Sequence, residues 1–231
     1  ITDIDDIKTK ITIATNSQTA IRREQLQAMT EFQKTLENYY GTYRGIDQIY
    51  YERRPGQYQS NASIKRSRII TISNQIKAFG SMYLEIPHLV TTYIGTVVRD
   101  YIEIENPKIF NSLHRPIWYY MSALAFNRLD SLFRLRTIAP EYQKFKWFLI
   151  MIFGKQNNLG KSVISRMNSE KISNQLCEPI IQILLDDTQY KLALIKSAEI
   201  LASTGIDLLN KQLLKSSEIT DKISVAMRKT P

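Results

Sequence analysis

One nine-residue stretch, Phe145 to Phe153, constrains the fold most, because eight of its nine side chains are apolar. A helix over about residues 141–154 would be apolar on all its faces, and such a helix belongs in the centre of a protein core. The stretch is about half as long as the roughly 20 residues that cross a bilayer. We therefore expect a globular protein with no membrane contact, in which this helix is central.

The other apolar residues recur mostly at helical spacing. They predict helices over about residues 3–14, 23–40, 115–136, 170–185 and 190–214, with a short helix after Ser217. For residues 3–14 a strand is the alternative, because all three residues of Ile11-Thr12-Ile13 are β-branched and such residues favour strands. Gly41 is expected to end the second helix, and Asp186-Asp187 to cap the helix that follows them.

Two short β-prone segments, residues 46–54 and 68–72, lie in the N-terminal third. Ser73 is expected to cap a helix that ends before Pro87. Two such strands are not stable alone, so they either pair against helices or extend a sheet that lies upstream. The predicted fold is mainly α and bundle-like, with a small two-stranded β element. We divide it into a mixed region, 1–106, and a helical region, 107–231.

Charge and cysteine content narrow the classes of function. The 231 residues carry a net charge of +9, of which +7 lies in residues 61–160, so a polyanion would meet that part first. The single cysteine, Cys177, excludes a disulfide framework and a cysteine-based zinc site, and two histidines leave little for metal chemistry. We expect a cytoplasmic protein whose residues here bind no metal or other cofactor.

The densest candidate site is the segment Tyr50 to Tyr58, in which tyrosines accompany two adjacent arginines. On a strand, Tyr51 and Arg53 share one face, while Glu52 and Arg54 share the other. Guanidinium groups bind phosphate oxygens and aromatic faces stack on bases. Tyr51, Arg53 and Arg54 are therefore candidates for nucleic-acid contact. The equally good alternative is that Glu52 pairs with one arginine in a structural ion pair while the tyrosines fill the core.

Two further polar segments are candidate phosphate sites. The first is a loop with three positive charges in four residues, namely Lys65, Arg66 and Arg68. Such a loop contacts a phosphate backbone without reading sequence; a solvated basic loop is the alternative. The second precedes a predicted helix, where backbone amides favour anions, and comprises Asn16, Gln18, Arg22 and Arg23. An ordinary helix-capping turn is the alternative there.

The sequence contains no complete active site. The catalytic residues are unknown, and Glu52, beside two arginines, is the candidate for acting on a phosphoester. Three arginines on the predicted helix after Pro116, namely Arg128, Arg134 and Arg136, are expected to lie on its solvated side.

Several of these segments together resemble the abortive-infection phage-resistance (AIPR) proteins of prokaryotes. The distinctive segments are Thr15-Asn16-Ser17-Gln18 and Tyr50-Tyr51-Glu52-Arg53-Arg54 with Tyr58, and the likeness covers about residues 1–155. Positions that match motifs of the family are Asn16, Gln18, Tyr51, Glu52, Arg53 and Arg54. The resemblance assigns these residues no individual role.

The resemblance implies a part in antiviral defence. Family members carry, nearer their N-terminus, an Asp…Gln-x-Lys pattern like that of restriction-endonuclease folds, which has no matching positions here. We therefore expect a C-terminal portion of a nuclease-like parent, with any divalent metal bound upstream and no enzymatic activity of its own. This portion would bind DNA or RNA. Alternatively, its C-terminal helices would form a homo-oligomer or bind another protein, with no nucleic-acid contact.

Overall fold

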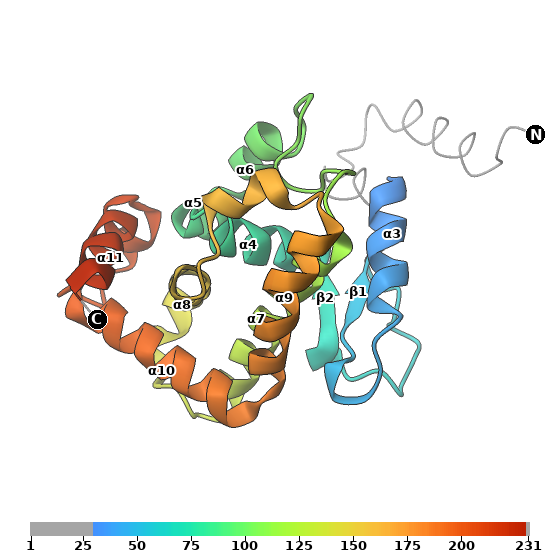
Figure 1. Ribbon diagram of the computed structural model, residues 1–231. Coiled ribbons are helices and arrows are strands. Elements are labelled where there is room, and N and C mark those ends of the chain that lie inside the picture. Colours follow the sequence, from blue (N-terminus) through green and yellow to red (C-terminus); the bar gives the residue numbers. More distant parts are fainter. Residues whose placement is uncertain (1–29, 230–231) are drawn as a thin grey trace, which may run out of the picture.

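The computed structural model describes residues 30–229. The predictions for residues 3–14 and 15–19, and for the first part of the helix at 23–40, lie outside this range. From Thr30 onward the fold is mainly α with a small two-stranded sheet in the N-terminal third, as the sequence predicts (Figure 1).

The helices are α3 (Glu31–Tyr40), α4 (Ile72–Met82), α5 (Pro87–Thr92), α6 (Ile94–Tyr101), α7 (Pro116–Arg134), α8 (Lys146–Gln156), α9 (Glu170–Leu185), α10 (Asp187–Ser203) and α11 (Glu218–Lys229). Short 3₁₀ helices cover Gly45–Asp47, Arg66–Arg68, Pro140–Phe145, Lys161–Arg166 and Lys211–Lys215. The strands are β1 (Tyr50–Glu52) and β2 (Ile69–Thr71).

Capping side chains explain where several of these helices begin. Asp186 accepts hydrogen bonds from the backbone N–H groups of Thr188 and Gln189, both at 2.9 Å, which confirms the predicted cap of α10. The predicted cap at Ser73 is wrong, because the hydroxyl of Thr71 accepts from the backbone N–H of Asn74 at 3.2 Å and α4 begins two residues earlier.

Helix α10 is shorter than the sequence predicts. It ends at Ser203 rather than near residue 214. Gly205 follows with a φ of 68°, a left-handed conformation that stops a helix and that glycine adopts without strain. The apolar residues beyond Gly205 belong to a separate connection and the 3₁₀ helix Lys211–Lys215.

Helix α8 lies in the middle of the molecule, as its composition predicts. Every residue from Trp147 to Gly154 is buried. Helices α4, α5, α7 and α10 pack around it, and Figure 1 shows it nearly end-on between them. Helix α7 in turn packs against α3 and α9, so the outer layer of the bundle is built on α7.

The two strands pair with each other in parallel, with Tyr51 opposite Ile70. Helix α3 packs against β1, and β2 leads directly into α4. A sheet this small depends on the helices for its stability. The strands therefore adopt the first of the two predicted arrangements, pairing against helices, among the residues that the structure describes.

Buried polar groups link these layers. The side chain of Gln75, which is fully buried, accepts a hydrogen bond from the hydroxyl of Tyr40 on α3. Its amide nitrogen lies 3.2 Å from the backbone oxygen of Tyr119 and 3.2 Å from the hydroxyl of Ser122, both on α7. Because a buried amide is costly when unpaired, this network fixes how α3, α4 and α7 meet.

The predicted boundary near residue 106 stays a prediction, and the buried residues on its two sides belong to one hydrophobic cluster. Within residues 30–229, no helix has both the length and the apolar character needed to cross a bilayer.

The packing of α4 against α5 yields a stability prediction. A Cβ at Gly80 would lie 2.8 Å from Cγ1 of Val90, so Gly80→Ala forces the two helices apart. We expect a loss of unfolding free energy of about 1–2 kcal/mol in urea titrations, since overpacking outweighs the gain in helix propensity.

The matched control is Gly95→Ala in α6, where a Cβ would meet nothing within 4 Å. It should leave stability unchanged or raise it by less than about 1 kcal/mol. Val90→Ala should recover part of the loss when combined with Gly80→Ala. Equal stability of the two alanine variants would contradict the prediction.

Candidate nucleic-acid interface

Tyr51 does not offer its ring to a base. It is the central residue of β1, and its side chain points into the core. Only 1% of the residue is exposed to solvent. Its hydroxyl donates to the side-chain oxygen of Gln33, and its ring lies 5.2 Å from that of Tyr40. Burial raises the pKa of this hydroxyl. The predicted stacking role of Tyr51 is therefore corrected to a core role, the alternative that the sequence left open.

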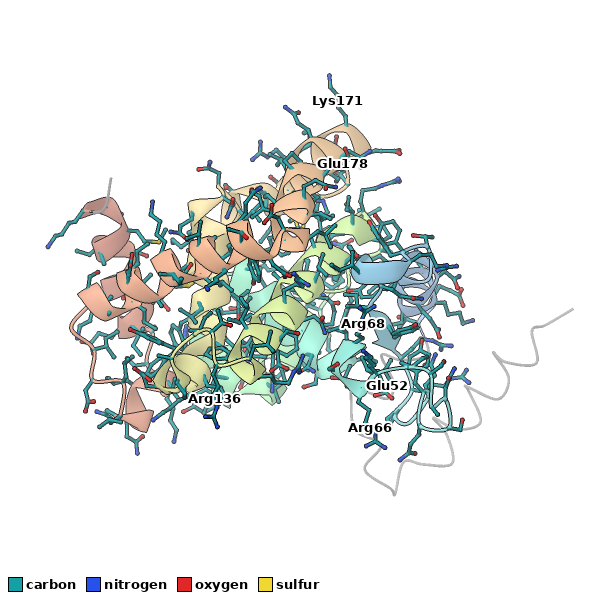
Figure 2. All side chains as sticks on the ribbon, turned by 90° about the horizontal axis from the view of Figure 1, so that it is seen from below. Glu52, Arg66, Arg68, Arg136, Lys171 and Glu178 are labelled. Atoms are coloured by element: carbon teal, nitrogen blue, oxygen red, sulfur yellow. The ribbon has the colours of Figure 1, made fainter. Side chains whose placement is uncertain are left out.

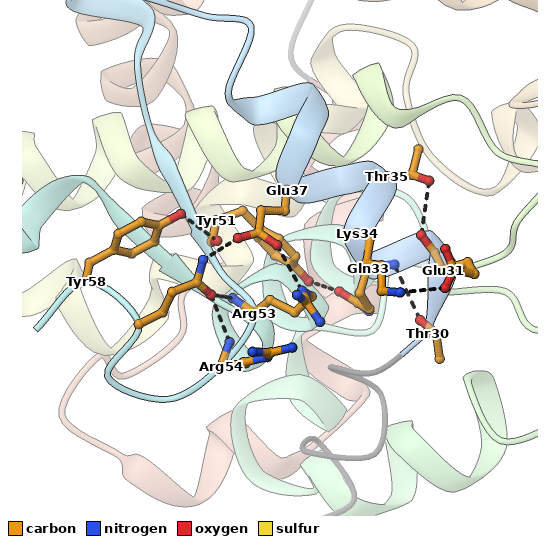
Figure 3. Close-up of polar contacts among 11 residues, drawn as sticks. Thr30, Glu31, Gln33, Lys34, Thr35, Glu37, Tyr51, Arg53, Arg54 and Tyr58 are labelled. Atoms are coloured by element: carbon orange, nitrogen blue, oxygen red, sulfur yellow. Dashed lines mark hydrogen bonds and ion pairs between the residues drawn. The ribbon is translucent and has the colours of Figure 1, made fainter. Parts of the chain in front are cut away.

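Arg53 forms an ion pair with α3. Its Nε lies 2.9 Å from Oε2 of Glu37, and the two side chains are 11% and 25% exposed (Figure 3). A guanidinium held in this way is not an open phosphate clamp. The sequence proposed Glu52 as the structural partner of an arginine, but the partner is Glu37, which lies sixteen residues before Arg53.

Gln57 completes this network. Its amide nitrogen donates to Oε1 of Glu37, and its oxygen accepts from the backbone N–H groups of Arg53 and Arg54, each at 3.2 Å. The chain segment after β1 is thus fixed to α3. This role of Gln57 was not predictable from the sequence, because residue type and spacing do not show which helix a loop amide will contact.

Arg54 differs from its neighbour. Its side chain is exposed, and no acidic group within residues 30–229 forms an ion pair with it. Its backbone is nevertheless held in place by Gln57. Arg54 therefore presents a free positive charge from a fixed position.

The cations of the basic loop also differ in burial and in their partners. Arg68 is half-buried, and its Nη1 donates to the backbone oxygens of Gly45 at 2.6 Å and Gln48 at 3.4 Å, so it serves the fold. Lys65 and Arg66 are exposed, and the described part of the chain provides neither with an acidic partner within ion-pair distance.

The loop is anchored on α7. The side-chain amide of Asn127 donates to the backbone oxygen of Ser67 at 2.6 Å. Arg66 projects to the same side of the molecule as Arg136, and Lys171 projects to the opposite side (Figure 2). Arg136 is exposed, and its backbone φ is 54°. Exposed charges from two distant parts of the sequence therefore face the same way.

Two other arginines of α7 form ion pairs. Arg128 pairs with Asp187 at the start of α10, and Arg134 with Asp130 one helical turn away. These pairs hold helices rather than ligands. The predicted exposure is confirmed for Arg134, whose side chain is 46% exposed, and for Arg136, just beyond the end of the helix. It is wrong for Arg128, whose side chain is 17% exposed.

The remaining predicted residues are located as follows. Asn16, Gln18, Arg22 and Arg23 lie outside the described residues. Glu52 is half-buried on β1. The described residues hold no group of three His, Cys, Asp or Glu side chains that could bind a metal ion. His114 hydrogen-bonds the hydroxyl of Tyr119 at 3.1 Å, and burial lowers its pKa to about 4.

Comparison with known protein families gives a match that covers nearly the whole chain. The family model described as AIPR protein matches residues 1–227. No curated protein and no solved structure matches the chain.

The two adjacent arginines should differ in their effect on stability. Arg53→Ala leaves the partly buried carboxylate of Glu37 without its cation, and we expect unfolding in urea to show a loss of about 1–3 kcal/mol. Arg54→Ala removes the same charge from an exposed position and should stay within about 0.5 kcal/mol of the parent chain. If both substitutions cost the same, the ion pair is not what holds this segment.

Proposed function

This chain belongs to the AIPR protein family, and we propose that it contributes nucleic-acid binding to an abortive-infection antiviral defence protein. The observation that carries the proposal is a set of exposed cations on fixed backbone, Arg54, Lys65 and Arg66. A free guanidinium or ammonium group on a rigid loop binds phosphate oxygens without first breaking an ion pair or ordering the chain.

The proposal assigns different tasks to residues that are adjacent in sequence. Tyr51, Arg53 and Arg68 position the backbone, and Arg54, Lys65 and Arg66 contact phosphates. With Tyr51 in the core, the surface offers charge rather than a stacking platform at this point. We therefore propose contact with the sugar-phosphate backbone and little dependence on base sequence.

Nuclease activity of the parent protein, with Glu52 as a catalytic group, stays a prediction. Its chemistry requires acidic side chains that converge on a metal ion. A preference for DNA or RNA also stays open to measurement, because phosphate groups are common to both.

Salt-dependent titration tests the proposal. The full chain is titrated with duplex DNA and with RNA, and log K is plotted against log salt. Combined substitution of Arg54, Lys65 and Arg66 by alanine should weaken binding at least about tenfold and lower the slope for duplex DNA by about 2–3, because each lost phosphate contact removes about 0.9.

A charge-matched control separates this surface from general attraction by a basic protein. Substituting Lys171, Lys191 and Lys196 by alanine removes the same charge from exposed positions on α9 and α10. Binding should fall less than about twofold in this variant. A binding constant that does not change with salt concentration, or an equal loss of affinity in both variants, would refute the proposed surface.

Self-association is the second candidate function, and exposed apolar side chains in the C-terminal third favour it. Leu192 is 61% exposed, Leu209 77% and Val225 49%. The two-sided apolar character of the segment from residue 190 is not itself support, because α10 packs against α8, α9 and α11 within the chain.

Light scattering of the full chain at several concentrations tests this second candidate. If these side chains join two copies, Leu192→Ser combined with Leu209→Ser should reduce the measured mass to that of one chain. Leu113→Ser, at a site 70% exposed before α7, is the matched control and should leave the mass unchanged. A mass equal to one chain for the unsubstituted protein at all concentrations would exclude self-association.

A further inference from the structure

A pocket of about 600 Å³ lies between α3 and α9. This volume falls within the range of about 300–1,000 Å³ that is usual for small-molecule sites. The residues of the predicted phosphate surface do not line it. It is therefore a separate cavity with its own chemistry.

One wall of the pocket is a polar face of α9. Asn174, Glu178 and Gln182 are spaced four residues apart, so they lie on one side of the helix on successive turns. All three residues are exposed to solvent. Pro179 lies beside them and has no N–H, so the backbone oxygen of Gln175 lacks its usual helical donor. This wall is rich in hydrogen-bond acceptors.

The opposite wall consists of two tyrosines of fixed geometry. The hydroxyls of Tyr39 and Tyr43 are 3.0 Å apart. The ring of Tyr43 stacks on that of Tyr120, with centroids 3.7 Å apart and an interplanar angle of 6°. Burial raises the pKa of both Tyr39 and Tyr43, so both hydroxyls are neutral. The aromatic wall needs no rearrangement to receive a ligand.

The charge of the pocket has the opposite sign to that of the chain. Glu178 supplies a negative charge, and the lining formed by the described residues contains no Lys, Arg or His. Arg115 lies close enough to Tyr39 to act on its pKa, but its guanidinium is paired with Glu170. Within residues 30–229, no cation forms an ion pair with Glu178. Ile117 and Ile181 add apolar surface. A phosphate group would be repelled here, whereas a planar group with N–H donors would be attracted.

We infer that this pocket binds a small molecule with two adjacent N–H donors on one planar edge, which pair with the two carboxylate oxygens of Glu178. The amides of Asn174 and Gln182 contact the rest of the planar group, and the tyrosine rings and isoleucines cover its apolar part. Two kinds of molecule carry such an edge: an alkylguanidinium, and the guanine base of a nucleoside. The inference does not depend on nucleic-acid binding by the basic loop.

Binding of two probes to the full chain tests the inference, by calorimetry or by ligand-detected NMR at about millimolar concentration. Agmatine represents the guanidinium source and guanosine the base source. At least one of them should bind, and Glu178→Gln should weaken that binding about tenfold or more, because the amide keeps the shape but loses one acceptor and the charge.

The controls separate the pocket from other effects. Glu199→Gln makes the same charge change at an exposed site on α10 and should leave affinity within about twofold. Guanosine monophosphate should bind more weakly than guanosine, because its phosphate meets a negative site. Glu178 is exposed, so its substitution should leave the fold intact, which circular dichroism checks.

The binding data decide the inference either way. A loss of affinity in Glu178→Gln but not in Glu199→Gln supports the inference. The probe that binds then identifies which kind of molecule supplies the planar edge. Absence of binding by both probes, binding that survives Glu178→Gln, an equal loss in Glu199→Gln, or a preference for the monophosphate would each overturn it. None of these results bears on the basic loop, whose test uses polynucleotides and other residues.

Discussion

The complete burial of α8 is the constraint on which the rest of this structure depends. A helix that is apolar on every side must be surrounded, and α4, α5, α7 and α10 are the elements that surround it. Close approach is needed as well: a Cβ at Gly154 would lie 3.0 Å from the backbone oxygen of Met82 in α4. Once α4 and α7 are fixed by α8, the outer faces of α7 become the support for α3 and α9.

Both candidate sites follow from that arrangement, and they differ in chemistry. On one side, α3 holds the segment after β1 through Glu37, and α7 holds the basic loop through Asn127. On the other, α3 and α9 enclose an acidic, amide-lined pocket. The same helix thus contributes Glu37, whose carboxylate neutralises an arginine, and Tyr39, which lines the pocket. Phosphate groups suit the first site and N–H donors the second.

The sequence predicted those elements whose local signals agree. Helix α9 has the predicted bounds, because Ser169 caps its start and Asp186 ends it. The sequence also predicted that Tyr51 and Arg53 lie on one face of the strand, but it did not predict which face of the strand lies toward the core. That choice depends on Gln33 and Glu37, which lie on a different helix. The spacing of Asn174, Glu178 and Gln182 is visible in the sequence, whereas their meeting with Tyr39 is a tertiary event that no local pattern contains.

Parallel pairing of β1 and β2 allows the segment between them to vary in length without disturbing the sheet. Residues 53–68 leave the sheet at one end and must return to the other, so they form a crossover whose ends are fixed by strand register and whose middle lies outside the core. Doubling the length of such a loop costs only about 0.6 kcal/mol in closure entropy. Insertions or exchanges here would therefore alter the proposed phosphate-contacting residues while leaving the interior untouched, so that this surface can diverge faster than the architecture.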